Sequence, residues 1–179
     1  MPSLRAQPTT PGGAPLGRRT LSAASYVYCT DCHNNDTGRN LGQISGPAGP
    51  HGSNLPHLLE RMNQLESPPP TPGSGGAGLS YSLTNYALCD KCHDVSGSIL
   101  QKQSFSEHAM HIRGQNAACS TCHDPHASPG PMLVNFDRSI VGPSSSGRLE
   151  YQRTGFRQGI CYLRCHGEDH SPERYGPGN

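Results

Sequence analysis

The stretch Cys119-Ser120-Thr121-Cys122-His123-Asp124-Pro125-His126 holds two cysteines, a histidine directly after the second, and another histidine three residues later. The same Cys-x-x-Cys-His arrangement occurs at residues 29–33 and 89–93, and a form that is one residue longer occurs at residues 161–166. These four motifs use all 8 cysteines of the chain. With 10 histidines in 179 residues, four such placements by chance have a probability on the order of 10⁻⁵, so the pattern has a chemical cause.

A Cys-x-x-Cys-His motif is the attachment signature of c-type haem. Two thiols bond to the vinyl groups of one porphyrin, and the adjacent imidazole binds the iron. The sequence therefore predicts four covalently bound haems c. The predicted thioether residues are Cys29, Cys32, Cys89, Cys92, Cys119, Cys122, Cys161 and Cys165. The predicted proximal iron ligands are His33, His93, His123 and His166.

Zinc binding and disulfide bonding fit the paired cysteines less well than haem does. Structural zinc sites use Cys-x-x-Cys pairs that two further ligands complete, but each pair here is followed at once by histidine, so every site would have to borrow a fourth ligand. Disulfide bonds could pair eight cysteines in an exported chain, but they would leave the four adjacent histidines unexplained. Haem attachment accounts for both residue types.

The composition favours a chain whose core is cofactor rather than side chain. Only 32% of the residues are hydrophobic, and there are 22 glycines, 17 prolines, three phenylalanines and no tryptophan. Such a chain has too little apolar surface to offset the entropy of ordering it, and four porphyrins would supply the missing surface. We expect a small haem-packed fold that is mostly coil with short α-helices and minimal or no β-sheet. We also expect the haem-free chain to stay unfolded.

Proline and glycine mark the expected boundaries along the chain. They predict an extended arm over residues 1–22, a single tetrahaem domain over 23–179, and a Pro/Gly-rich loop at 67–79 within it. Apolar residues at helical spacing predict a helix over 55–65. The capping box of Ser104 and Glu107 predicts a second helix over 104–114. A helical turn is expected at each haem motif.

Six histidines lie outside the motifs, and each haem iron has a second axial position that histidine or methionine can fill. We expect bis-histidine ligation of all four haems. The candidate distal ligands, strongest first, are His108, His111 and His126, then His51, then the weaker His170, with His57 last. The competing methionine ligands are Met62, Met110 and Met132.

Chain geometry restricts which iron each candidate can reach. Pro125 ends the helical turn of the third motif, and His126 is too close in sequence to reach the opposite face of the ring that His123 binds. His126 is therefore expected to serve a different haem. His108 and His111 lie one turn apart and face the same way, so they are expected to bind two different irons.

Three segments, residues 49–53, 104–111 and 119–126, resemble the multihaem cytochromes with doubled CxxCH motifs, and the likeness extends over most of residues 26–175. The haem count and chain length are also similar to those of tetrahaem subunits of extracellular cytochrome filaments. That resemblance implies a homopolymer joined by end-to-end haem contacts, in which one axial histidine can come from the adjacent subunit. Because these families attach haem outside the cytoplasmic membrane, it also implies an extracellular or cell-surface location, or a periplasmic one.

Electron transfer is the function that these features favour, with other redox proteins or extracellular electron acceptors as partners. We expect a subunit of an extracellular cytochrome filament, with a monomeric periplasmic shuttle as the alternative. A multihaem oxidoreductase would need an iron with an open coordination site, and six spare histidines argue against one, so no enzymatic activity is expected. A net charge of +1 without long charged runs gives no indication of nucleic-acid binding, and no stretch is long and apolar enough to predict a membrane span.

Overall fold

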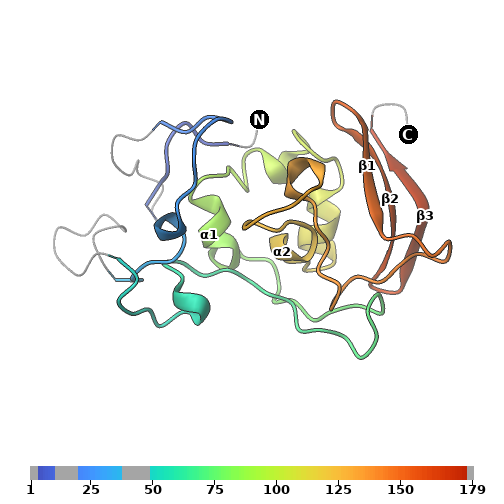
Figure 1. Cartoon of the computed structure of the whole chain (residues 1–179), viewed down its shortest axis with the longest axis horizontal. Helices are drawn as coiled ribbons and strands as arrows, with labels where there is room; N and C mark the ends of the chain where they lie inside the picture. The colour runs from blue at the N-terminus through green and yellow to red at the C-terminus, as the bar shows by residue number, and fades with distance from the viewer. Residues whose placement is uncertain (1–3, 11–19, 38–48, 177–179) are drawn as a thin grey trace. The chain divides into compact units, whose positions relative to one another are not determined.

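The computed structural model describes residues 4–10, 20–37 and 49–176 (Figure 1). The chain divides into two compact units. The first unit comprises Met1–Asn63 and Ser82–Leu100, and the second comprises Gln64–Tyr81 and Gln101–Asn179. The motifs at residues 29–33 and 89–93 belong to the first unit, and those at residues 119–123 and 161–166 belong to the second. Each unit thus carries two of the four haem motifs.

Short helical turns form the regular structure of the first unit. They are the 3₁₀ turns Cys29–Asp31, Pro56–Leu58 and Leu83–Tyr86 and the α-helix α1, Ala87–Asp90. A further 3₁₀ turn, Ile99–Gln101, follows. The helix predicted over 55–65 is wrong, because only one turn forms there. His57 and Leu58 have φ angles of 62° and 54°, which no right-handed helix can continue through.

The second unit contains two helical segments that carry predicted ligands. The π-helical turn Met110–Gly114 continues from helical residues 108 and 109, so the helix predicted over 104–114 forms in its second half. The α-helix α2, Cys119–Cys122, coincides with the third haem motif. The 3₁₀ turn Pro131–Leu133 follows it. Of the described residues, none belongs to a helix with the length and apolar character needed to cross a membrane.

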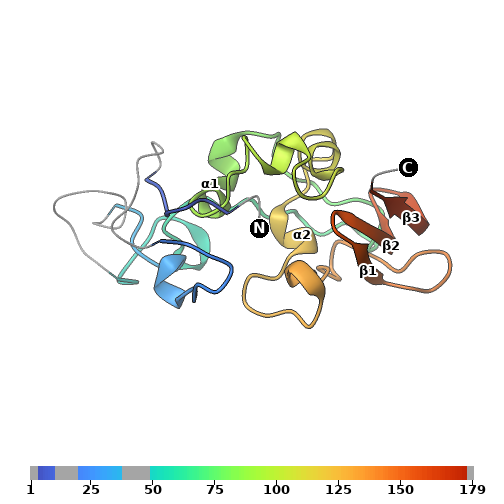
Figure 2. The same cartoon turned by 90° about the horizontal axis from the view of Figure 1, so that it is seen from above.

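A three-stranded antiparallel sheet corrects the expectation of minimal or no β-sheet. Strands β1 (Glu150–Gly155), β2 (Gln158–Cys165) and β3 (Glu168–Tyr175) lie side by side in the order β1-β2-β3 (Figures 1 and 2). His166 and Gly167 form the two-residue turn between β2 and β3, with φ angles of 52° and 80°. Positive φ at both positions is what a tight two-residue hairpin requires. The sheet could not be predicted from the sequence, because β1 and β3 are mostly polar and show no apolar alternation.

The apolar core beside the sheet is small. Ile140, Val141 and Leu163 are buried together, and partly buried hydrophobic residues pack against them: Phe136, Leu149, Cys161 and Cys165. Two of the six largest fully buried side chains in the described residues, Gln64 and Glu60, are polar. Since fully buried carboxylates are rare unless paired, this composition agrees with a chain that has little apolar core of its own.

Candidate haem-binding motifs

One helical turn positions the reactive side chains of the first three motifs. In each motif, the backbone N–H of the histidine donates to the backbone carbonyl of the first cysteine. The distances are 2.8 Å for His33 and Cys29, 2.9 Å for His93 and Cys89, and 2.9 Å for His123 and Cys119. Each is an i to i−4 bond, so the histidine stacks over the first cysteine, and the second cysteine lies on the same side of the turn. The expected helical turns are confirmed at these three motifs.

The fourth motif has a different conformation, and the helical turn expected there is wrong. Cys161 and Cys165 lie on strand β2, and His166 begins the turn to β3. Residues four apart on a strand point to the same face, and both cysteines pack with Leu163 against the same apolar cluster. Arg164 anchors the strand through backbone bonds of 2.7 and 3.0 Å to Gly142.

Backbone carbonyls orient two of the motif imidazoles. His33 Nδ1 lies 2.8 Å from the carbonyl oxygen of His57, and His123 Nδ1 lies 2.9 Å from that of Met132. A carbonyl can only accept, so Nδ1 carries the proton and Nε2 keeps its lone pair. This tautomer, fixed by a hydrogen bond on the other nitrogen, is the form in which histidine binds a metal through Nε2.

The carbonyls belong to matching segments, which we call straps. The strap of the first motif is residues 50–60, and the strap of the third is residues 125–135. In both, an isolated antiparallel bridge joins the strap to the motif histidine: Leu59 to His33, and Val134 to His123. The next strap residue donates its N–H to the backbone carbonyl of the second cysteine of the motif. Glu60 donates to Cys32 at 2.9 Å, and Asn135 donates to Cys122 at 3.0 Å.

A sequence repeat that the cysteine spacing does not reveal encodes the straps. Both contain the pattern Pro-His-x-Ser-x-x-Pro-x-Leu, at residues 50–58 and 125–133. The serine hydroxyl closes each strap on itself, because Ser53 donates to the Leu59 carbonyl and Ser128 to the Val134 carbonyl, both at 2.6 Å. The repeat also makes His51 and His126 equivalent residues. Aligning the residues that follow each motif, rather than the motifs alone, would have revealed it.

Burial keeps several motif thiols protonated. It raises the pKa of Cys32 to about 11, and the nearby thiols Cys92 and Cys89 add to the effect against the opposing charge of Lys91. Burial also raises the pKa of Cys122 to about 12, with Cys165 and Cys161 adding to it. The two motifs of each unit also lie close together, because Lys91 Nζ donates to the Asp31 carbonyl and the Glu66 carboxylate contacts both Thr121 and His166.

The thiols and imidazoles of the motifs supply the groups that haem attachment needs. None of the eight cysteines forms a disulfide bond. Each motif offers two thiols for the two thioether bonds of a covalent haem and one imidazole for its iron.

The imidazole of His108 faces that of the third motif. The ring centres of His108 and His123 are 6.3 Å apart. A metal–nitrogen bond is about 2 Å long, and a ring centre lies about 1.2 Å behind its nitrogen, so two imidazoles on opposite sides of one metal have centres about 6.4 Å apart. Burial, helped by His123 and His111, lowers the pKa of His108 to about 3, and burial also lowers the pKa of His123. Both rings are neutral, as iron ligands must be.

Phe105 contacts the imidazoles of both His108 and His111. Its ring makes an edge contact with His108 at 5.1 Å and a stacked contact with His111 at 5.8 Å. Tyr175 of β3 packs on the same ring, with centres 4.3 Å apart. His111 Nδ1 lies 2.9 Å from the Glu107 carbonyl, which gives this imidazole the same tautomer as the strapped histidines.

The remaining predicted ligands have varied surroundings. His126 is 79% exposed, with its Nδ1 3.6 Å from Asp124, and His51 and His57 are exposed as well. His170 is half-buried on β3, where burial and the nearby His111 lower its pKa. His166 Nε2 is buried, 3.8 Å from the Glu66 carboxylate. Their ligand roles, and that of His93, stay predictions.

Comparison with known families agrees with this geometry. Residues 111–140 match the doubled CXXCH motif. The match begins at His111 and includes the third haem motif and its strap. It supports a multihaem c-type cytochrome with covalently bound haem c, which is typical of electron carriers. No curated protein and no solved structure matches the chain.

Proposed function

We propose that this chain is a tetrahaem electron-transfer protein with two histidine ligands on each iron. When bound, haem supplies a reversible one-electron couple, and the chain's residues fix the position of each ring and the identity of its axial ligands. The observation that carries the proposal is the 6.3 Å separation of His108 and His123. It matches two imidazoles on one metal and therefore argues against an open coordination site at the third haem.

The proximity of the two motifs within each unit supports transfer between haems. Lys91 of the second motif donates to the Asp31 carbonyl of the first at 2.6 Å. The Glu66 carboxylate contacts Thr121 of the third motif and lies 3.8 Å from His166 of the fourth, so two attachment points lie close together in each unit. Porphyrins attached at neighbouring motifs are held near each other, which is the condition for fast electron exchange. The first and second haems would form one pair and the third and fourth the other.

The direct test counts haems and determines the spin state of each iron. Mass spectrometry and pyridine haemochrome analysis of purified holoprotein should give four covalent haems per chain. Electron paramagnetic resonance of the oxidised protein should show only low-spin ferric signals, and the reduced protein should not bind cyanide or nitrite. Fewer than four haems would contradict the tetrahaem assignment, and a high-spin iron that binds nitrite would favour a reductase.

Assembly is a separate part of the proposal. The resemblance to filament subunits favours an extracellular polymer with end-to-end haem contacts. The pairing of residues 4–9 with the second haem motif favours a monomeric periplasmic shuttle, since it accounts for these residues without a neighbouring subunit. Negative-stain microscopy of holoprotein purified from the exported fraction separates the two, because a filament subunit gives fibres and a shuttle gives single particles.

A further inference from the structure

The second haem motif is strapped by the beginning of the chain. No Pro-His-x-Ser-x-x-Pro-x-Leu pattern lies between the second motif and the third. Instead, Leu4 forms the antiparallel bridge to His93. The next residue, Arg5, donates its N–H to the Cys92 carbonyl at 2.8 Å. Leu59 and Glu60 make the same bridge and the same hydrogen bond with the first motif. Val134 and Asn135 make them with the third.

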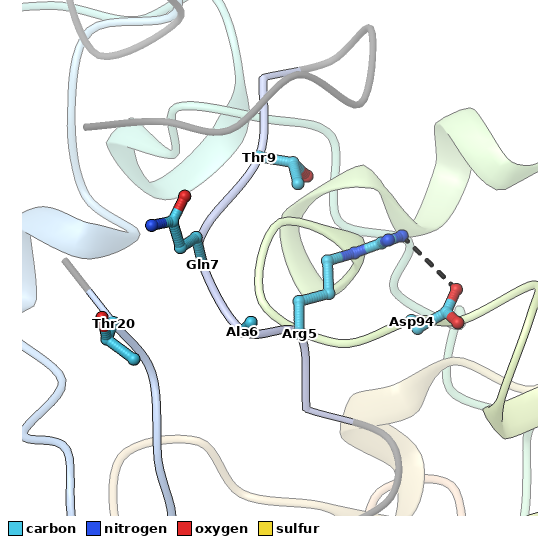
Figure 3. A pocket seen from close by; sticks show the side chains of 6 residues that line it. All are labelled: Arg5, Ala6, Gln7, Thr9, Thr20 and Asp94. Atoms are coloured by element: carbon cyan, nitrogen blue, oxygen red, sulfur yellow. Dashed lines mark ion pairs between the residues drawn. The ribbon is translucent and has the colours of Figure 1, made fainter. Parts of the chain in front are cut away.

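Side-chain contacts fasten this segment, which we call the N-terminal strap (residues 4–9), to the motif. Arg5 Nη2 pairs with Asp90 Oδ1 at 2.7 Å, and Arg5 Nε donates to the Asp90 carbonyl at 2.9 Å, across 85 residues of sequence. Arg5 Nη2 also lies 3.6 Å from Asp94 (Figure 3). The N–H of Thr9 donates to the Lys91 carbonyl at 3.0 Å. Four consecutive motif residues, 90–93, therefore contact the strap.

Polar contacts hold the side of the strap that faces away from the buried Pro8. On one side it borders a cavity of about 470 Å³, lined by Arg5, Ala6, Gln7, Thr9, Thr20 and Asp94 (Figure 3). None of these residues is a large hydrophobic one. The buried guanidinium of Arg61, which donates to the Thr9 carbonyl, is a further polar anchor. Polar bonds to the motif and to Arg61 therefore hold the strap in place.

We propose that the N-terminal strap is a positioning segment for the second haem, which fixes the 89–93 turn and the backbone that carries Cys92 and His93. The inference rests on the proposed function, since it assigns a structural role toward one of the four haems. Besides lacking the sequence pattern of the other two straps, it differs from them in its place along the chain. The positioning segment precedes its motif by most of the first unit, so the second haem depends on the chain's N-terminal region.

The test compares three holoproteins, each exported from a cleavable signal: the parent, a variant lacking residues 1–9, and Arg5→Ala. Arg153→Ala is the matched control, because Arg153 is exposed on β1 and makes a local hydrogen bond to the Gly155 carbonyl, 2 residues away in sequence. In both strap variants, one low-spin signal and one of the four midpoint potentials should shift, while the other three stay unchanged. Adding a synthetic peptide of residues 1–10 to the truncated protein should reverse the shift.

The affected haem can be identified directly. Haem-methyl NMR signals assigned through the thioether protons of Cys89 and Cys92 should be the ones that move. If truncation prevents haem attachment, peptide mapping by mass spectrometry should find the loss at Cys89 and Cys92 alone. Unchanged spectra and potentials in both strap variants, or changes confined to another haem, would overturn the inference. A parent protein with fewer than four haems would instead count against the proposed function.

Discussion

The imidazole rings of His108 and His123 lie 6.3 Å apart with their planes inclined at 40°. His123 Nδ1 donates to the Met132 carbonyl, and His108 Nδ1 lies 3.3 Å from the hydroxyl of Ser104. Each ring thus has one nitrogen engaged with the protein and the other available for a metal. This geometry predicts that the two residues are the axial pair of the third haem.

Replacing His108 tests that pair. In His108→Ala, four haems should still be attached, but one iron should become high-spin because its distal nitrogen is gone. Electron paramagnetic resonance detects the change, and added imidazole should restore the low-spin signal. Arg113→Lys is the control, since Arg113 is exposed on the same helical segment and is not a candidate ligand. A fully low-spin His108→Ala protein would show that His108 is not a ligand.

His126 provides a second test of ligand assignment. The spacing of His126 from His123 predicts that His126→Ala leaves four haems attached and makes one iron high-spin, at a haem other than the third. The exposed imidazole of His126 makes this a demanding test. Were the haem of the third motif the one to change, the sequence argument would be incorrect. The equivalent variant His51→Ala measures whether the two strap histidines behave alike.

Phe105 should control the orientation of the two imidazoles that it contacts, those of His108 and His111. Phe105→Leu removes the edge contact with His108 and the stacked contact with His111 while keeping an apolar side chain. Both irons should stay low-spin, but their g values should spread, because the ligand planes are no longer fixed. Phe156→Leu, at a residue that is 73% exposed, should leave the g values unchanged. Identical spectra for both variants would remove Phe105 from this role.

Glu60 should make stability depend on pH. Its side chain is fully buried, with Lys91 Nζ 2.6 Å and Arg61 Nε 3.3 Å from its carboxylate. Burial raises the pKa of Glu60 despite the nearby charges of Lys91 and Arg61. Because the folded pKa lies above the unfolded one, the stabilisation is complete below pH 4.5, the ordinary value, and is lost as pH rises through the folded pKa.

Glu60→Gln should remove this dependence. Urea unfolding of the holoprotein at a series of pH values upward from 4.5, the ordinary pKa, gives the slope of the unfolding free energy against pH. The slope should be flatter in Glu60→Gln than in the parent. The exposed Glu168→Gln should keep the parent slope. Parallel slopes in all three proteins would contradict the prediction.

The strap serines should contribute equally at two different haems. Ser53→Ala and Ser128→Ala each remove two hydrogen bonds: the one that the hydroxyl donates to a strap carbonyl, and the one that it accepts at 3.0 Å from the N–H of Leu55 or Gly130. Each bond is worth about 1 kcal/mol. Each variant should lower the unfolding free energy by a similar amount and perturb the haem of its own motif, the first or the third. Ser139→Ala is the control, because the Ser139 hydroxyl bonds to exposed Asp137, 2 residues away. Unequal losses would mean that the straps are not equivalent.

The sequence predicted those features that depend only on local chain geometry, namely the helical turns of the haem motifs. The spacing of Cys119, Cys122 and His123 specifies one helical turn, and the structure has that turn at three motifs. The sheet could not be predicted in the same way, because strands β1 and β3 gain their order from pairing with β2 rather than from an apolar alternation of their own. Long-range pairing also explains why the N-terminal strap was missed: nothing near Leu4 in the sequence points to His93.

The fourth motif's extra residue has a consequence for how such signatures should be recognised. In a helical turn, side chains three apart point the same way, but along a strand only even spacings do. An ordinary Cys-x-x-Cys on β2 would direct its two sulfurs to opposite faces of the sheet. The longer spacing is therefore the form that a strand requires of two cysteines that are to bond to one porphyrin. If the fourth motif binds haem as proposed, searches that accept only the helical spacing will miss motifs of this kind.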